Sequence, residues 1–182
     1  MEVTTNELWT IIHGMGFGAI FLLAFAGGLA GLFSLKPELV TVTGIRERTN
    51  RLNVGMWVMA IVVWLTVITG TFIVYPFYRA KPPSGVDLTN AAALIEYPRY
   101  FLLASASTAE WHKFGMEWKE HVAWLAPMAA TVVAFLVTYY GPRLAKHPEI
   151  RRAAVIFFSV AFFTACVAGA FGAFITKAAP LH

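Results

Sequence analysis

The sequence predicts an all-α integral membrane protein, a single domain formed by a bundle of four transmembrane helices. Only 13% of the 182 residues are charged and 58% are hydrophobic, whereas a soluble domain carries about 25% charged residues. The charges are nearly absent from four long runs and gather between them, which is typical of membrane spans. Each run matches or exceeds the roughly 20 residues that cross the hydrocarbon core of a bilayer. The predicted spans are residues 8–35, 53–78, 118–140 and 152–176.

Residues that start and stop helices bound these spans. We expect Thr5 or Asn6 to cap the first span, because a side-chain oxygen there accepts a hydrogen bond from a free backbone N–H. Pro37, Pro82 and Pro142 follow the first three spans, since proline cannot continue a helix. No Lys or Arg precedes the first span, so we expect no cleavable signal peptide and a first run that remains a span.

The basic residues predict the orientation of the bundle. Lys and Arg gather in two segments between spans, and loops of this kind stay on the cytoplasmic side. Both termini should then lie outside, which in a bacterial cell is the periplasmic face of the inner (plasma) membrane. We interpret the net charge of +4 as contacts with lipid headgroups and exclude nucleic acid as a partner. The basic segments are residues 36–51, with Lys36, Arg46, Arg48 and Arg51, and residues 141–152, with Arg143, Lys146, Arg151 and Arg152.

Residues 79–117 are predicted to form an aromatic-rich outer cap between the second and third spans. Residues 82–85 (PPSG) are a turn signal. Residues 97–103 (YPRYFLL) suit the depth of lipid headgroups. The segment from Ala109 onward is interpreted as a helical extension of the third span. The cap is expected to lie on the outer membrane surface, where a partner protein can dock.

Small residues recur at i, i+4 spacing in the first and fourth spans. Such ridges let helix backbones approach closely in lipid, and we interpret them as packing faces. A second interpretation of Gly14 and Gly18 is room for a flat cofactor. Cys166, the one cysteine, lies in an apolar run and is interpreted as a small core residue. The ridges are Gly14/Gly18, Gly27/Gly31 and the series Ala161, Ala165, Gly169 and Ala173.

Two histidines are predicted at one depth on different helices. His13 follows Trp9 by one turn, and His121 lies just after Trp118, so each is near the outer start of its span. The first and third spans run in the same direction, so residues near their starts share a depth. Two imidazoles in this arrangement suit the two axial positions of one haem iron. We therefore predict His13 and His121 as the iron ligands of a haem b.

His112 is the competing ligand. In a continuous helix it lies about 13 Å from His121 along the axis and on the opposite face, so the two cannot bind one iron together. His112 is then an alternative ligand or a supporting hydrogen-bond partner. The other interpretation of each histidine is a structural hydrogen bond to a neighbour or a headgroup. His147 and His182 are interpreted as solvated.

Acidic residues gather at the same outer surface. With the neighbouring lysines Lys113 and Lys119 they are interpreted as a solvated ion-pair face. The alternative is a carboxylate that accepts a proton from a quinol beside the haem. No hydrolase, phosphate-loop or nucleophile motif is present, so no catalytic residue is predicted. The acidic residues are Glu110, Glu117 and Glu120.

The layout resembles the four-helix, haem b membrane-anchor subunits of respiratory complexes. The resemblance rests on His13 in the first span, His121 in the third and the aromatic outer cap. It covers the architecture of the whole chain but only two specific residues. It implies electron transfer between a quinone pool and a partner subunit.

Three functional hypotheses follow. The first is a membrane subunit of a respiratory or photosynthetic electron-transfer complex that binds haem b and/or interacts with quinone, alongside other subunits and a periplasmic or extracellular partner. At most, this is an electron-transfer subunit of an oxidoreductase. The alternative is a cofactor-free structural accessory subunit, favoured by the near absence of polar groups mid-membrane. The third is a small-molecule channel formed on oligomerisation, although the lack of intramembrane charge argues against an ion pathway.

Overall fold

The computed structural model describes residues 3–37 and 41–179. Every regular element in these residues is a helix, and four continuous stretches are long and apolar enough to cross a membrane. The all-α class and the four membrane-length helices are therefore confirmed. The four helices are Thr5–Ser34, Thr43–Tyr78, Ala106–Lys146 and Pro148–Ala178.

Each helix except the fourth is a series of segments that differ in how tightly the backbone is wound. The first helix consists of α1 (Thr5–Ile11), the π-helical η1 (Ile12–Gly18) and α2 (Ala19–Ser34). The second consists of α3 (Val42–Thr69), the π-helical η3 (Gly70–Val74) and α4 (Tyr75–Tyr78). The third consists of α6 (Ala106–Glu110), the π-helical η5 (Trp111–Met116) and η6 (Trp118–Val122), α7 (Leu125–Tyr140) and the 3-10 segment η7 (Gly141–Lys146). The fourth is α8 (Pro148–Ala178).

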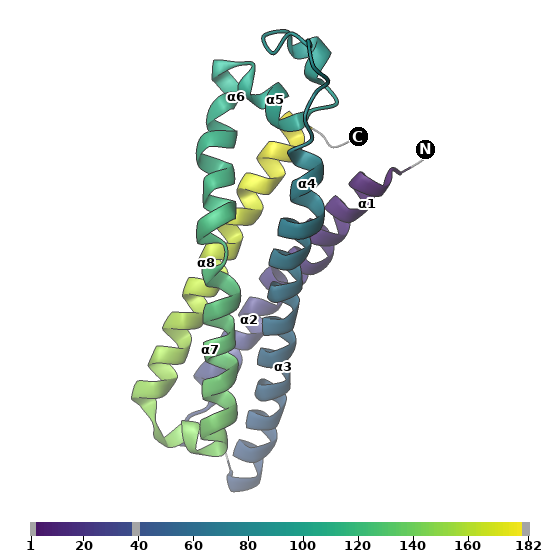
Figure 1. Cartoon of the computed structure of the whole chain (residues 1–182). Coiled ribbons are helices and arrows are strands. Elements are labelled where there is room, and N and C mark those ends of the chain that lie inside the picture. Colours follow the sequence, from purple (N-terminus) through teal and green to yellow (C-terminus); the bar gives the residue numbers. More distant parts are fainter. Residues whose placement is uncertain (1–2, 38–40, 180–182) are drawn as a thin grey trace.

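Neighbouring helices alternate in direction (Figure 1). The start of α1, the cap with α5 (Pro98–Leu103) and the end of α8 lie together at one end of the bundle, which we call the cap end. The start of α3 and the turn at η7 lie at the opposite end, which we call the basic end because it carries the two basic segments. Residues 38–40 of the first basic segment lie outside the described residues. The described chain thus begins and finishes at the cap end, while the assignment of that end to the outer side remains a prediction from the charges.

Two helices extend well beyond the predicted spans. The second starts at Val42 rather than near residue 53, and the Thr41 hydroxyl caps it by accepting a hydrogen bond from Gly44 N–H at 3.2 Å. The third starts at Ala106, so the helical extension predicted from Ala109 onward is confirmed and begins three residues earlier. Hydropathy marks where a chain enters lipid, whereas a helix continues into the polar layer on either side.

The first helix is capped by Thr4 rather than by Thr5 or Asn6. The Thr4 hydroxyl accepts a hydrogen bond from Glu7 N–H at 3.2 Å, and the Glu7 carboxylate accepts one from Thr4 N–H at 2.8 Å. This reciprocal pair is a capping box, which satisfies two free donors at once and so determines where the helix starts.

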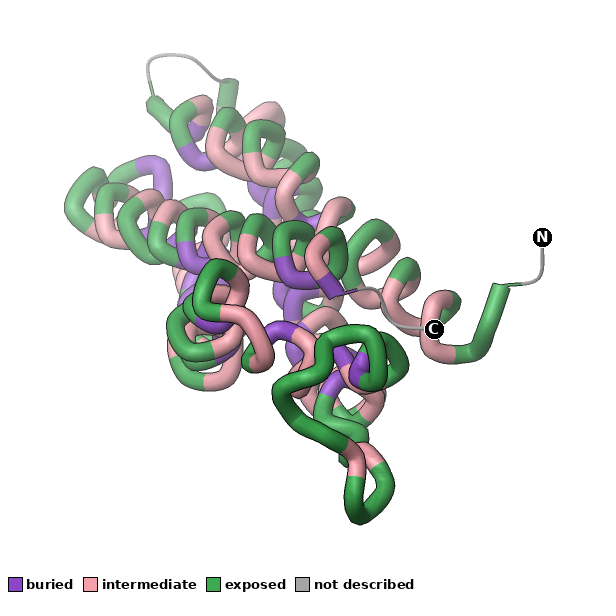
Figure 2. Tube along the Cα trace, turned by 90° about the horizontal axis from the view of Figure 1, so that it is seen from above, coloured by how far each residue is buried: buried purple, intermediate pink, exposed green. Residues whose placement is uncertain are grey.

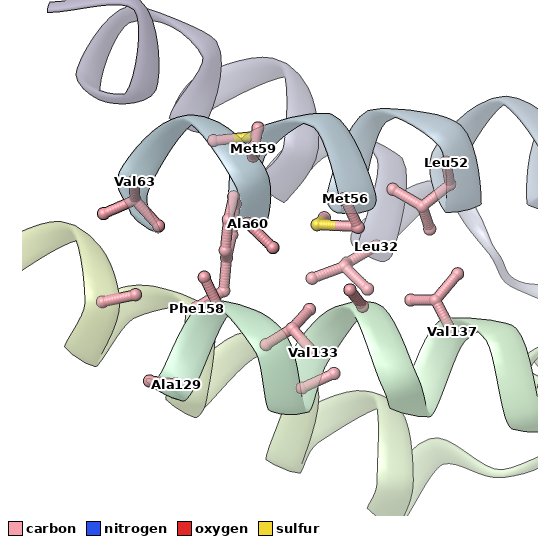
Figure 3. Packing of buried hydrophobic residues seen from close by; sticks show 14 of the residues in the cluster. Leu32, Leu52, Met56, Met59, Ala60, Val63, Ala129, Val133, Val137 and Phe158 are labelled. Atoms are coloured by element: carbon pink, nitrogen blue, oxygen red, sulfur yellow. The ribbon is translucent and has the colours of Figure 1, made fainter. Parts of the chain in front are cut away.

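An apolar core fills the basic-end half of the bundle. Phe158 of α8 is fully buried against residues from α2, α3 and α7 (Figure 3). Glycines permit this close packing, because a Cβ on Gly28 would lie 2.8 Å from the Phe158 ring and one on Gly31 would lie 2.7 Å from Leu52 Cδ1. The core includes Leu32, Leu52, Met56, Met59, Ala60, Val63, Ala129, Val133, Val137 and Phe158.

A second, smaller apolar cluster lies at the cap end. It consists of Tyr78, Leu102, Met116, Ile175 and Ala179. The cap rests on this cluster through Leu102 of α5, which is fully buried. The predicted turn at residues 82–85 is present, and Gly85 adopts a φ of 90°, a conformation that favours glycine. Nearby, hydrogen bonds from the Thr89 hydroxyl and N–H hold the pKa of Asp87 below its ordinary value.

The outer surfaces of the helices are apolar. Viewed along the bundle, buried residues lie between the helices and exposed residues cover the outside (Figure 2). Leu23, Phe72 and Phe163 are 82%, 68% and 64% exposed. Aliphatic and aromatic side chains in such positions suit contact with lipid tails. Cys166 is also exposed, so its interpretation as a core residue is wrong.

Candidate functional site

The zone between the two apolar clusters is where the helices depart from regular α-geometry. The π-helical segments η1, η3 and η6 lie there, on three different helices. A π-turn contains more residues per turn than an α-turn, leaves backbone groups less regularly paired, and is frequent at functional sites. We call this part of the bundle the wide-turn zone.

Prolines account for two of these segments. Pro76 follows η3 and Pro127 follows η6, and proline cannot donate the backbone hydrogen bond that an α-helix needs from that position. The backbone responds by widening upstream, and Ala123 N–H donates to the carbonyl of Trp118 at 3.1 Å, one residue farther back than in an α-helix. The η1 segment has no proline and contains Gly14, Gly16 and Gly18.

His13 of η1 is held against the second helix. Its Nδ1 lies 2.8 Å from the carbonyl oxygen of Thr66 and 3.4 Å from the hydroxyl of Thr69. A carbonyl oxygen only accepts, so Nδ1 carries the proton and donates. In the neutral ring Nε2 is then left with its lone pair. No hydrogen bond of Nε2 is present among the described residues.

A glycine makes room for this imidazole. A Cβ added to Gly70 of η3 would lie 2.6 Å from His13 Cε1, closer than real side chains approach. The His13 ring therefore lies directly on the backbone of the second helix, and no larger residue at position 70 is compatible with this placement.

Lys119 lies in η6 of the third helix, in the same zone. It is partly buried, and its Nζ would lie 3.0 Å from a Cβ added to Gly172 of α8. Its charge acts electrostatically on His13. Among residues 3–37 and 41–179, Lys119 makes no hydrogen bond or ion pair. Sequence reasoning had placed Lys119 on a solvated ion-pair face, and that interpretation is wrong for this residue.

His121, the predicted partner of His13, lies on the surface. Its side chain is 71% exposed, and its Nε2 is 3.2 Å from a carboxylate oxygen of Glu117 on the same helix. Glu117, Glu120 and His121 bring their ligand atoms within 4.8 Å of one another, so they could hold a metal ion. The described contacts of His13 and His121 are with different residues, and the haem-bridging pair stays a prediction.

His112 and two tyrosines form a polar chain at the cap end. The Tyr78 hydroxyl is 2.8 Å from His112 Nδ1, and the Tyr75 hydroxyl donates to Glu120. The two tyrosine rings stack with centroids 6.2 Å apart. Arg99 acts electrostatically on both Tyr78 and His112, and its buried Nε has no partner among the described residues.

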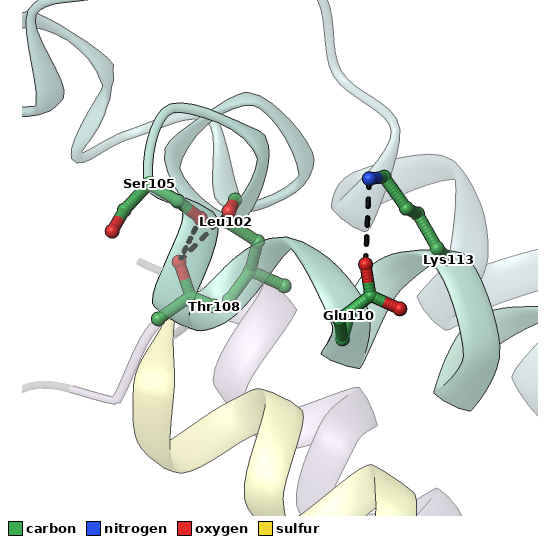
Figure 4. A network of polar contacts seen from close by, with 5 residues as sticks. All are labelled: Leu102, Ser105, Thr108, Glu110 and Lys113. Carbon is green, nitrogen blue, oxygen red and sulfur yellow. Dashed lines mark hydrogen bonds and ion pairs between the residues drawn. The ribbon is translucent and has the colours of Figure 1, made fainter.

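The remaining predicted residues have simpler surroundings. Glu110 pairs with Lys113 at 3.4 Å on the exposed surface, beside the hydrogen bonds of Thr108 (Figure 4), which fits an ion-pair face. A Cβ added to Gly14 would meet no atom within 4 Å, whereas a Cβ added to Gly18 would lie 3.8 Å from Thr66 Cγ2. His147 contacts Glu149 at 3.0 Å, and His182 lies outside the described residues.

Sequence reasoning did not single out Lys119, Tyr75 or Tyr78. The available signal was the pair of prolines, because Pro76 and Pro127 indicate widened turns just upstream of each. A widened turn rotates the residues that precede it relative to those that follow, so a helical wheel drawn through it assigns the wrong faces.

Comparisons with known proteins give no identification. No protein-family model matches the sequence, no curated protein is significantly similar to it, and no solved structure matches the fold. We therefore infer function from the chemistry of the chain's own residues.

Proposed function

We propose that this chain is the membrane subunit of a respiratory or photosynthetic electron-transfer complex, and that it binds haem b and/or interacts with a quinone in the wide-turn zone. The observation that supports this is His13. Its Nδ1 donates to the Thr66 carbonyl at 2.8 Å, which leaves Nε2 available to a ligand. Histidines that bind metals nearly always carry such a hydrogen bond on the other ring nitrogen, because it fixes the ring and its tautomer.

The donor set fits a haem iron at His13. The group would supply one-electron transfer when bound. His121 is the proposed second ligand, and His112, whose Nδ1 is engaged by the Tyr78 hydroxyl, is the alternative. His121 would have to leave Glu117 to serve, and an exposed ion pair of this kind contributes little to stability.

A difference spectrum of the purified protein tests the haem arm. Reduction should produce an α-band of the b type, and His13→Ala should abolish it, while His147→Ala, which changes a histidine at the basic end, should leave it unchanged. Extraction of the purified protein with organic solvent tests the quinone arm by measuring bound quinone. A preparation with neither haem nor quinone contradicts the proposal.

The second candidate is a cofactor-free accessory subunit. It is favoured by the first helix, of whose most apolar window only 11% is buried within the bundle. A helix so weakly covered offers a large apolar face to other subunits. If His13→Ala and His121→Ala chains still join their native complex and its activity is unchanged, this candidate replaces the first.

A further inference from the structure

Lys119 presents hydrogen-bond donors without an acceptor. Its amine carries N–H groups and lies in the wide-turn zone, where no described residue accepts from it. Lys119 is partly buried, and partial withdrawal of a charged amine from water without a partner is unfavourable. A ligand that supplies an acceptor oxygen would remove this cost.

His13, on the first helix, needs a hydrogen-bond donor where Lys119 needs an acceptor. Its Nε2 is an acceptor, because Nδ1–H is already donated to Thr66. A ligand that satisfies both residues must therefore accept from Lys119 and donate to His13. A phenolic hydroxyl does both through one oxygen atom.

Both side chains are accommodated by the helices opposite them. His13 lies on Gly70, at a distance that any side chain at that position would obstruct, and Lys119 Nζ would lie 3.0 Å from a Cβ added to Gly172. His13, Gly70 and Lys119 all lie in π-helical segments. The charge of Lys119 acts electrostatically on His13, so two polar groups of complementary type influence each other in an otherwise apolar part of the bundle.

The donor and acceptor pattern distinguishes between ligands that a membrane contains. A phospholipid phosphate has acceptor oxygens and a negative charge, so it suits Lys119 but meets the lone pair of His13 unfavourably. A quinol headgroup is uncharged, planar and soluble in the bilayer, and its hydroxyl supplies the donor as well as the acceptor.

We infer that Lys119 and His13 bind the headgroup of a quinol, whose hydroxyl groups donate to His13 Nε2 and accept from Lys119 Nζ. This inference rests on the quinone arm of the proposed function, because an Nε2 that accepts from a quinol hydroxyl has no second lone pair for a haem iron. It names the substrate class of that arm and a second binding residue. Electron transfer from the bound quinol is left to the complex, and no further residue is required for the binding itself.

Binding of a short-chain quinol tests whether Lys119 and His13 hold such a headgroup. The purified full-length chain in lipid nanodiscs is titrated with decylubiquinol, and quenching of tryptophan fluorescence is followed, since Trp118 is adjacent to Lys119 in the chain. Lys119→Met and His13→Gln should each weaken binding by about tenfold or more, the loss expected for a hydrogen bond to a charged or buried group. Lys119→Gln, which keeps an N–H donor, should recover part of the loss.

Two matched controls change residues outside the proposed site. Lys113→Met removes an exposed lysine that pairs with Glu110, and His147→Gln removes a histidine at the basic end that pairs with Glu149. Both should bind decylubiquinol within about twofold of the unaltered chain. Circular dichroism of each variant checks that helicity is retained.

Three outcomes overturn the inference. The first is equal binding by Lys119→Met and the unaltered chain. The second is an equal loss of binding in the Lys113→Met and His147→Gln controls. The third is loss of the quenching when phosphatidylglycerol is added to the nanodiscs. Competition of this kind would assign Lys119 to a lipid phosphate. If a b-type spectrum is present while any of these holds, the proposed function survives; if haem and quinol binding are both absent, both fail.

Discussion

The basic-end half of the bundle and the wide-turn zone are built on opposite principles. In the basic-end half, α2, α3, α7 and α8 are regular, and apolar side chains such as Phe158 and Leu32 fill the space between them completely. In the wide-turn zone the helices are irregular, and His13, Thr69 and Lys119 take the place of aliphatic residues. Apolar packing and polar side chains are thus separated along the axis of one bundle.

The largest expected effect is in the basic-end half. Phe158→Ala leaves a cavity beside Gly28 and should lower the free energy of unfolding by about 3–5 kcal/mol. Reversible unfolding in mixed micelles measures this. Phe163→Ala on the same helix is the control, because Phe163 is 64% exposed and should change stability by less than about 0.5 kcal/mol. Equal losses at the two positions would mean that packing is not concentrated where the structure places it.

Gly70→Ala should displace the His13 ring from the second helix. Its Cβ would lie 2.6 Å from His13 Cε1, so the ring must leave Thr66, at a cost of about 1–3 kcal/mol and with loss of ligand binding. Gly55→Ala on the same helix meets nothing within 4 Å and should stabilise the protein slightly, by up to about 1 kcal/mol. The two alanine variants should therefore shift the unfolding midpoint in opposite directions. A shift of the same sign and size in both would argue against the described contact.

Lys119→Met sharpens the comparison because stability and binding should move apart. Removing a partly buried cation that has no partner should raise the free energy of unfolding by about 1–2 kcal/mol while quinol binding falls. Lys113→Met, on the exposed surface, should leave the free energy of unfolding within about 0.5 kcal/mol. A clear loss of stability in Lys119→Met would show that the lysine serves as a structural contact.

The smallest effect is expected at Tyr78. Tyr78→Phe removes the hydroxyl that bonds to His112 Nδ1 and should cost about 1 kcal/mol of stability. Tyr139→Phe is the control, because Tyr139 is 61% exposed and its hydroxyl has no partner among the described residues. Thermal unfolding followed by circular dichroism would compare the two, and equal midpoints would indicate that the Tyr78–His112 bond contributes nothing net.

The four helices could be predicted from sequence because lipid imposes a long apolar run on each of them. The start of the second helix could not, since Val42 begins a helix in a polar segment where capping and packing, rather than hydropathy, decide. His13 was identified because an imidazole in an apolar run stands out. Lys119 was missed because it was grouped with Glu117, Glu120 and Lys113 by their proximity in the chain. In a regular helix it lies at least about 100° around the axis from each of them. The shared depth of His13 and His121 was predicted by counting residues from the start of each span. The helix face that each residue occupies depends on the π-turns, which the apolar pattern does not reveal.

The length of the third helix has a mechanical consequence. Its 41 residues, from Ala106 to Lys146, span about 60 Å, roughly twice the thickness of the hydrocarbon core. The surplus forms a stalk that continues from the bilayer to the cap, with Lys119 below it on the same rod. The stalk reaches the cap through η5 and η6, so a protein that docks on the cap would act on the same helix that carries Lys119. Contact at the surface and occupancy of the interior are then linked by a single helix.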